Sequence, residues 1–221
     1  GGVFSNDYSA EFDGVDDYAS FASFDFPSEK TVSYWIYLNS INSSGITIFG
    51  TGSNYYSHLL ANGQTMYIYT NSSSGGFAGA TALTLGSTHA ITTGSWIHIA
   101  IVGNGTSATL YKNGASIDTN TPDRMPINMQ RFGGHETGRY LDGKMDEVAY
   151  WDSALTATNI ADIYNGGTPV DLGVGGLNLS PVHWWRCGDN DGGTGTTITD
   201  QGSGGNNATL QNGASFVSDV P

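Results

Sequence analysis

Short segments of alternating apolar and polar residues run through most of the chain. In TVSYWIYLN, residues 31–39, one set of alternate positions is uniformly apolar or aromatic: Val32, Tyr34, Ile36 and Leu38. Because successive side chains of a strand point to opposite faces, this pattern predicts a strand with a buried face. Further segments of this kind occur at 8–21, 45–50, 58–70 and 95–105. The sequence therefore predicts an all-β domain built from many short antiparallel strands.

Two turns are marked by an Asn-Gly pair. ATLYKNGASID, residues 108–118, places Asn113 and Gly114 between two strand-like halves. Asn and Gly both accept the positive φ angles of a type I′ turn, so this segment is predicted to be a β-hairpin. Asn62 and Gly63 predict a second hairpin tip.

One segment has the pattern of a helix instead. In DSALTATNIADIYNGG, residues 152–167, Thr156 is a suitable N-cap, and Leu155 and Ile160 are spaced as a hydrophobic staple around it. Gly166 is a suitable C-terminal stop. The apolar positions lie on one face, which predicts a short helix packed on the surface of the β domain.

The chain after this helix divides into two parts. Residues 166–180, GGTPVDLGVGGLNLS, are expected to be a linker, whereas 181–221 regain an apolar pattern and include two adjacent tryptophans. Such a tail is not expected to hang free in water, and about 40 residues are too few for a second core. We expect residues 181–221 to return as strands, so that 1–221 forms one domain.

Composition and charge narrow the function. The 221 residues include 32 glycines, and only 12% are charged, which suits short strands joined by Gly-rich turns. The net charge is −13, and no Lys/Arg cluster exists to bind phosphates, so a nucleic-acid partner is not expected. The charge would also be repelled by an anionic membrane surface, and no apolar run approaches the roughly 20 residues of a membrane span. The excess of acidic over basic residues instead favours cation binding.

Several segments together resemble a known family. YSAEFDGVDDYASF, TVSYWIYLNS and DGKMDEVAYWDSAL occur in the order found in laminin-G-like domains of the concanavalin A-like lectin/glucanase superfamily. The resemblance implies a jelly-roll sandwich of two antiparallel sheets, one concave and one convex. The tail resembles a block that usually precedes FDGVDDY, so it implies a circularly permuted order. This order also resembles marine bacteriophage virion structural proteins, which implies a virion or extracellular surface location and virion or surface proteins as partners.

Two acidic segments are candidates for a metal site. Asp13, Asp16 and Asp17 lie in FDGVDDY, and Asp146 lies in DGKMDE. If the first strand and the later strand are neighbours, the end of one at Asp13 would meet the start of the other at Asp146. Like charges this close favour a bound cation, and Ca²⁺ accepts many oxygens at flexible angles. The family resemblance implies a structural Ca²⁺ at the position of Asp146, helped by backbone oxygens such as that of Gly14. The alternative is a set of solvated, metal-free Asp-Gly turns.

Hydrolysis is not expected. Glucanases of this superfamily use E-x-D-x-x-E, which this sequence lacks. The retaining mechanism needs two carboxyl groups about 5–5.5 Å apart, and strand alternation would place Asp146 and Glu147 on opposite faces. The remaining enzymatic interpretation is an accessory domain of a carbohydrate-active enzyme, or a glycoside hydrolase with an unrecognised site.

Aromatic residues offer a candidate glycan site. Tyr55, Tyr56 and His58 cluster after a Gly-rich stretch, where rings could stack against sugars. The alternative is that these rings cover the core. We therefore expect a non-enzymatic binding or structural module of a virion appendage or cell-surface assembly. Its ligand would be a glycan or a host surface, and the alternative is an assembly role with no such ligand. A homo-oligomer is compatible with either role.

Overall fold

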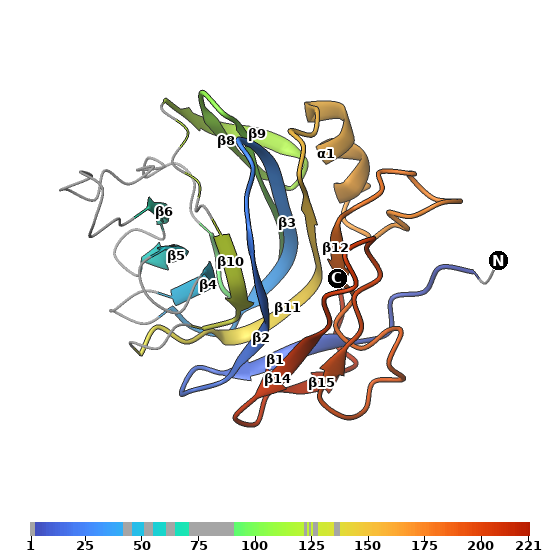
Figure 1. Ribbon diagram of the computed structural model, residues 1–221. Coiled ribbons are helices and arrows are strands. Elements are labelled where there is room, and N and C mark those ends of the chain that lie inside the picture. The colour runs from blue at the N-terminus through green and yellow to red at the C-terminus, as the bar shows by residue number, and fades with distance from the viewer. Residues whose placement is uncertain are drawn as a thin grey trace.

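The computed structural model consists of two antiparallel β-sheets packed face to face, with one described helix on the outside (Figure 1). It describes residues 3–41, 46–50, 55–60, 65–70, 91–121, 123, 125, 128–134 and 138–221, without the side chains of 47, 55–60, 65–70 and 120. The prediction of an all-β sandwich is confirmed.

The first sheet, sheet A, has eight strands among the described residues. Its order is β15-β1-β11-β3-β7-β8-β9, and β12 pairs with β11. The strands are β1 (Ser9–Asp13), β3 (Glu29–Leu38), β7 (Trp96–Asn104), β8 (Ala108–Lys112), β9 (Ala115–Asn120), β11 (Asp142–Trp151), β12 (His183–Trp185) and β15 (Ser215–Val217).

The second sheet, sheet B, has seven strands among the described residues, in the order β13-β14-β2-β10-β4-β5-β6. They are β2 (Tyr18–Asp25), β4 (Ile46–Gly50), β5 (Tyr55–Leu60), β6 (Thr65–Thr70), β10 (Asn128–Phe132), β13 (Thr197–Ile198) and β14 (Ala208–Gln211).

The main core lies between the two sheets. The alternation predicted for β3 is present, because its inward set is fully buried: Val32, Tyr34, Ile36 and Leu38. The outward residues Ser33 and Trp35 are buried as well. Sheet A therefore has a covered outer face, which the alternating pattern alone does not predict.

That cover is supplied by the helix α1 (Ala157–Tyr164) and the segment after it. Thr156 caps the helix by accepting a hydrogen bond from the Asn159 amide at 3.1 Å, as predicted. Asn165 is the C-cap in the left-handed conformation, and Gly166 follows it at C′ with a φ of 68°, as predicted. Residues 166–180, expected to be a linker, pack on the same face of sheet A, and Leu172 there is buried with the tryptophans of β11 and β12.

The Asn113-Gly114 hairpin is confirmed. These residues have φ angles of 50° and 80° and connect β8 to β9. A Cβ on Gly114 would also lie 2.9 Å from the ring of Tyr164, so the turn closely approaches the helix. The predicted tip at Asn62 and Gly63 lies outside the described residues.

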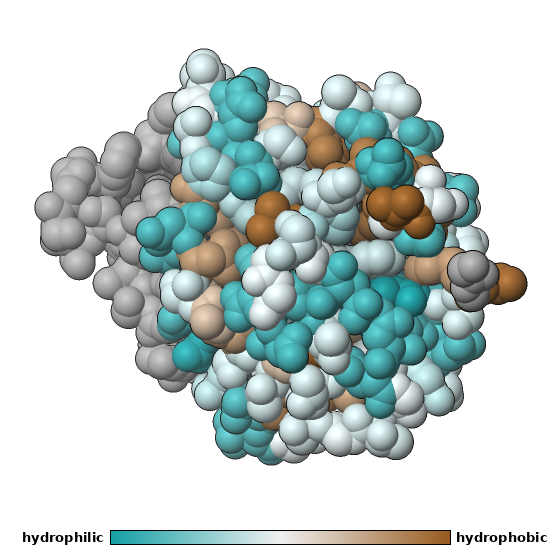
Figure 2. Space-filling model, turned by 45° about the vertical axis from the view of Figure 1, so that its right-hand side comes forward, coloured by the Kyte–Doolittle hydropathy of each residue, from teal (hydrophilic) through white to brown (hydrophobic). Residues whose placement is uncertain are grey.

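The C-terminal segment contributes to both sheets. β14 pairs with β2, and β15 pairs with β1, so the chain's last strands lie beside its first ones (Figure 1). Trp185 of β12 stacks on Phe21 in the core, with ring centroids 4.3 Å apart. Within the described part of the chain, no helix has the length and apolar character needed to cross a membrane. Figure 2 shows a face on which hydrophilic residues predominate and apolar residues form small separate patches.

Candidate functional site

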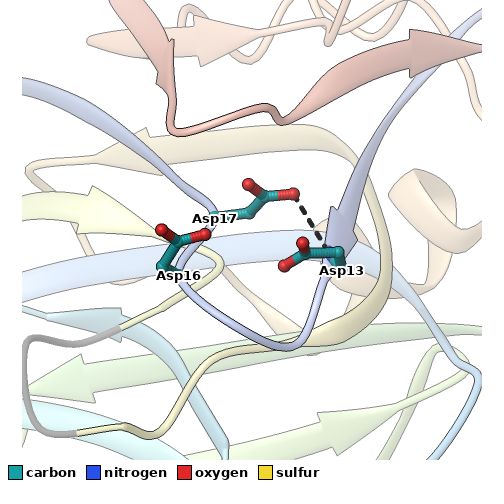
Figure 3. A group of neighbouring side chains, drawn as sticks. All are labelled: Asp13, Asp16 and Asp17. Atoms are coloured by element: carbon teal, nitrogen blue, oxygen red, sulfur yellow. Dashed lines mark hydrogen bonds between the residues drawn. The ribbon is translucent and has the colours of Figure 1, made fainter.

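Three aspartates gather at the turn between β1 and β2 (Figure 3). The Asp13 amide donates to Asp17 Oδ2 at 3.1 Å, and Asp13 Oδ1 accepts from the Val15 amide at 2.8 Å. Gly14 turns the chain with a φ of 77°, and a Cβ there would lie 2.8 Å from the Cβ of Asp142. Glycine is thus required both for the turn and for its close approach to β11. We call Asp13, Asp16 and Asp17 the acidic turn.

The acidic turn concentrates negative charge. Carboxylate oxygens of its three aspartates lie within 4.8 Å of one another. Asp17 is only 3% exposed, and its Oδ1 makes no well-formed hydrogen bond. Burial, followed by the charges of Asp13 and Asp16, raises the pKa of Asp17, and the amides of Asp13 and Ala214 only partly offset this. Partial desolvation of clustered carboxylates is the electrostatic situation that a cation relieves.

A cleft of about 370 Å³ opens beside this turn. It is lined by Glu11, Phe12, Asp13, Asp17, Asn39, Asp142, Gly213 and Ser215. Asp142 is held in place by the Asn39 side-chain amide, which donates to it at 3.0 Å, and by the Ser40 hydroxyl at 2.5 Å. The cleft is therefore lined by oxygen-bearing residues from four separate parts of the chain.

The predicted meeting of Asp13 with Asp146 is wrong. β11 begins at Asp142, and in the β1–β11 register Asp13 lies opposite Asp142. Asp146 is four residues further along, about 13 Å at the usual rise of a strand. A single ion cannot bind both Asp13 and Asp146, so the expected ligand set divides between two places.

Asp146 belongs to a second, buried cluster that includes Glu147 and Asp189. Their carboxylate oxygens also lie within 4.8 Å of one another. Arg186 Nε donates to Glu147 Oε1 at 2.9 Å, and Trp184 Nε1 donates to Glu147 Oε2 at 2.5 Å. We call Asp146, Glu147 and Asp189, together with Arg186, the buried cluster.

The expectation that Asp146 and Glu147 face opposite ways is also wrong. β11 carries a bulge between Asp146 and Ala149 where it pairs with β3, and Glu147 has a φ of 47°. The extra residue interrupts the alternation and brings both carboxylates to the same side. Neither can serve as an open catalytic pair, because Asp146 is fully buried and Glu147 is 5% exposed.

Burial dominates the protonation of this cluster. It raises the pKa of Glu147 to about 7, although Arg186 and Trp184 act in the opposite direction. It also raises the pKa of Asp146, and the neighbouring charge of Glu147 adds to the effect. Asp189 was not singled out by the sequence, since its segment GDNDGG has only the pattern of a turn.

The candidate glycan residues Tyr55, Tyr56 and His58 lie on β5 rather than in a loop. Their side chains lie outside the described part of the structure, so their role stays a prediction. The backbone register places Tyr56 opposite Gly50, and Gly50 opposite Arg131 of β10. Arg131 in turn pairs with Ser20, so this row crosses the middle of sheet B.

Comparison with known proteins agrees with this architecture. The chain belongs to the laminin-G-like family Laminin_G_3 of the Concanavalin A-like lectin/glucanases superfamily, whose model matches residues 13–161. No curated protein sequence matches the chain significantly.

Among solved structures, the chain resembles a "putative carbohydrate binding protein" from Bacteroides ovatus, with a TM-score of 0.68 and 19% identity. The match covers 99% of this chain and 62% of that one. Domain 4 of AbnA, an extracellular arabinanase from Geobacillus stearothermophilus solved with arabinotriose, gives a TM-score of 0.50 and 21% identity over 63% of this chain and 68% of that one. A heptameric SAP-like pentraxin from Limulus polyphemus gives a TM-score of 0.55 and 18% identity. That match covers 76% of this chain and 87% of the pentraxin chain. At these identities the likeness establishes the sandwich fold.

Proposed function

We propose that this domain is a non-enzymatic carbohydrate-binding module of an extracellular or virion surface. The observation that carries the proposal is the contrast between the outer faces of the two sheets. α1 and residues 166–180 cover sheet A with an apolar cluster, whereas no described element covers the outer face of sheet B. An open sheet face can present a ligand surface, and among the described residues Thr209 of β14 and Ala22 of β2 are exposed on sheet B, although Arg131 of β10 is buried.

The outer face of sheet B has groups suited to sugars. Gln211 donates to the Ser20 hydroxyl at 3.0 Å, and Thr209 beside them is exposed. The Tyr18 ring is partly exposed, and the buried Arg131 guanidinium lies 4.6 Å from its centre and supports it. Hydroxyl and amide groups exchange hydrogen bonds with sugar hydroxyls, while rings offer an apolar stacking surface. Tyr56 of β5 occupies a register position in the same row.

A glycan array tests this function directly. The array should hold neutral oligosaccharides, including arabinan fragments because of the AbnA relative, and binding of at least one class is expected. Tyr56→Ala and His58→Ala should weaken that binding, whereas Thr158→Ala on the exposed side of α1 should leave it unchanged. A uniformly silent array would overturn the glycan proposal, and retained binding by both variants would move the site away from β5.

The non-enzymatic part of the proposal is supported by the sealed Asp146–Glu147 pair and by the missing E-x-D-x-x-E pattern. Incubation with labelled oligosaccharides should release no new reducing ends. If the wild type releases reducing ends and the Asp13→Asn or Asp17→Asn variant does not, the protein would instead be a hydrolase with its carboxylates in the acidic turn.

We further propose that the acidic turn holds a structural Ca²⁺. The support is the buried Asp17 Oδ1 without a well-formed hydrogen bond, close to the carboxylates of Asp13 and Asp16. Asp13, Asp16 and Asp17 would hold the ion, with the Gly14 region and the Asp142 side of the cleft contributing further oxygens. Such an ion would fix the β1–β2 turn against β11. Calorimetric titration of chelator-treated protein with CaCl₂ should show binding, and the absence of heat and of any melting shift would contradict it.

The assembly that carries the domain is proposed to be a virion or cell surface, on the resemblance of its segment order to bacteriophage structural proteins. Immunogold labelling of intact particles with an antibody to this domain would test that location. Labelling confined to a soluble fraction would contradict it.

A further inference from the structure

A second cleft, distinct from the acidic turn and from the face of sheet B, opens at one end of the sandwich. Its volume is about 370 Å³, within the range of roughly 300–1,000 Å³ in which proteins hold small molecules. It is lined by Phe24, Asp25, Phe26, Pro27, Tyr150, Asp152, Val182 and His183. These residues come from the end of β2, the end of β11 and the start of β12, so the cleft lies where the two sheets meet. We call it the end cleft.

One wall of the end cleft is aromatic. Phe26 stacks on Tyr150 with centroids 4.9 Å apart and planes inclined by 17°, and Phe24 lies 4.8 Å from Tyr150. The Phe24 ring also lies 4.4 Å from His183. Phe24 and Phe26 are only partly buried, although both pack against the core. Part of an ordered aromatic surface therefore remains open to a ligand.

The polar groups of the end cleft are of two kinds. Asp25 and Asp152 are exposed, and neither carboxylate has a hydrogen bond or ion pair with a described residue. They can only accept hydrogen bonds. The Tyr150 hydroxyl is buried and has no hydrogen-bond partner among the described residues. Burial and the charge of Asp152 raise the pKa of Tyr150, so the hydroxyl keeps its proton and remains a donor.

His183 adds an oriented ring to this set. Its Nδ1 lies 2.6 Å from Asp200 Oδ2, and Asp200 is itself held by the amides of Trp184, Gly202 and Asn206. The bond to Asp200 fixes the imidazole and leaves Nε2 as the nitrogen not used by that contact. The site is thus built from groups that other parts of the fold hold in position.

We propose that the end cleft is a subsite for one neutral sugar ring of a glycan, a proposal that rests on the carbohydrate-binding function above. The ring's C–H face would lie against Phe24 and Phe26, and its hydroxyls would donate to Asp25 and Asp152. A sugar hydroxyl also accepts a hydrogen bond, and so can satisfy the buried Tyr150 hydroxyl once binding opens it to the cleft. An alkylammonium ion has donors only and leaves that group unsatisfied. An acidic sugar is disfavoured by the two carboxylates.

The experiment uses the full chain, isotope-labelled, and a set of neutral methyl glycosides followed by NMR chemical-shift changes. Shifts are expected at Phe24, Phe26, Tyr150 and His183. Tyr150→Phe should weaken binding about fivefold, the usual effect of one hydrogen bond. It should leave the melting temperature unchanged or raise it, because the deleted hydroxyl has no hydrogen-bond partner within the described part of the chain. Asp152→Asn should weaken binding by a similar factor, and Asp162→Asn on the exposed side of α1 should not change it.

The outcomes separate this inference from the general function. Binding that shifts only residues on the outer face of sheet B, or that is indifferent to both Tyr150→Phe and Asp152→Asn, overturns the end cleft and leaves the glycan function standing. Absence of binding by any glycan overturns both. Binding of tetramethylammonium that competes with the glycosides and fades with added salt would overturn the sugar assignment in favour of a cation site.

Discussion

The acidic turn and the buried cluster contain the same chemical groups in opposite surroundings. Each gathers three carboxylates within 4.8 Å. The acidic turn has two exposed members, and no basic residue is among the described residues that line its cleft. In the buried cluster Asp146 and Glu147 are buried, and Arg186 pairs with Glu147. Partial neutralisation by a built-in cation distinguishes the buried cluster. Proximity of acids alone therefore does not identify a metal site, because Arg186 partly neutralises one of the two groups, whereas two carboxylates of the other are exposed to solvent.

The largest effect should come from removing the built-in cation. Arg186→Met leaves Glu147 and Asp189 buried without their partner, and the free energy of unfolding should fall by about 3–5 kcal/mol, as for other broken buried pairs. Urea denaturation measures this. Combining it with Glu147→Gln should recover part of the loss. A cost under about 1 kcal/mol for Arg186→Met would show that the buried acids are neutral without it.

Calcium should distinguish the two groups next. A ligand at 100 times its dissociation constant stabilises the native state by about 2.7 kcal/mol. Thermal melts of chelator-treated protein with added CaCl₂ should show this gain in the wild type and in Glu147→Gln, but not in Asp17→Asn. Loss of the gain in Glu147→Gln alone would place the ion in the buried cluster and contradict the assignment to the acidic turn.

The pH dependence should be smaller and has a definite sign. The pKa of Glu147 is about 7 in the folded chain and near its ordinary 4.5 when unfolded. Between these values the folded state binds more protons, so stability is fully present below pH 4.5 and falls as pH rises towards 7, by about 1–3 kcal/mol. Denaturation at a series of pH values checks this. The slope should flatten in Glu147→Gln, and an unchanged slope would show that another group is responsible.

The smallest effect on stability is expected when Asp16 of the acidic turn is substituted in metal-free protein. Asp16 is exposed, and its charge contributes to the raised pKa of Asp17. Asp16→Asn relieves this repulsion, so chelator-treated protein should be unchanged or about 0.5 kcal/mol more stable. With calcium present the same change should weaken ion binding. A clear loss of stability in the metal-free protein would show that Asp16 has a structural role at the turn.

Local patterns predicted the elements well and the register poorly. The Asn113-Gly114 turn and the Thr156 cap depend on a few neighbouring residues, so the sequence contains what is needed to find them. The pairing of Asp13 with Asp142 depends on where β11 begins, and nothing local marks that residue. The predicted register was wrong by four residues, which placed Asp146 of the buried cluster beside the acidic turn.

The bulge at Asp146 and Glu147 was unpredictable for a different reason. The segment DEVAYW is compatible with a regular alternating strand. The extra residue of the bulge is detectable only from the pairing of β11 with β3. Burial of Trp184 and Arg186 beside Glu147 comes from a segment 37 or more residues away in the chain. The end cleft was missed likewise, because Phe24, Tyr150 and His183 are adjacent only after the sheets have packed.

The pairing of β1 with β15 has a mechanical consequence. Ser9 lies opposite Val217, and Glu11 lies opposite Ser215, so the chain enters and leaves this edge of sheet A at the same end. Beyond β15, Asp219 is fastened by Lys144 at 2.9 Å and by the Ser9 hydroxyl at 2.6 Å. A force applied between residues 8 and 220 would first detach Asp219 and then open the β1–β15 hydrogen bonds one after another. The fold would therefore yield by peeling from this edge, while the pairing of β11 with β3 and of β3 with β7 stays out of the line of load.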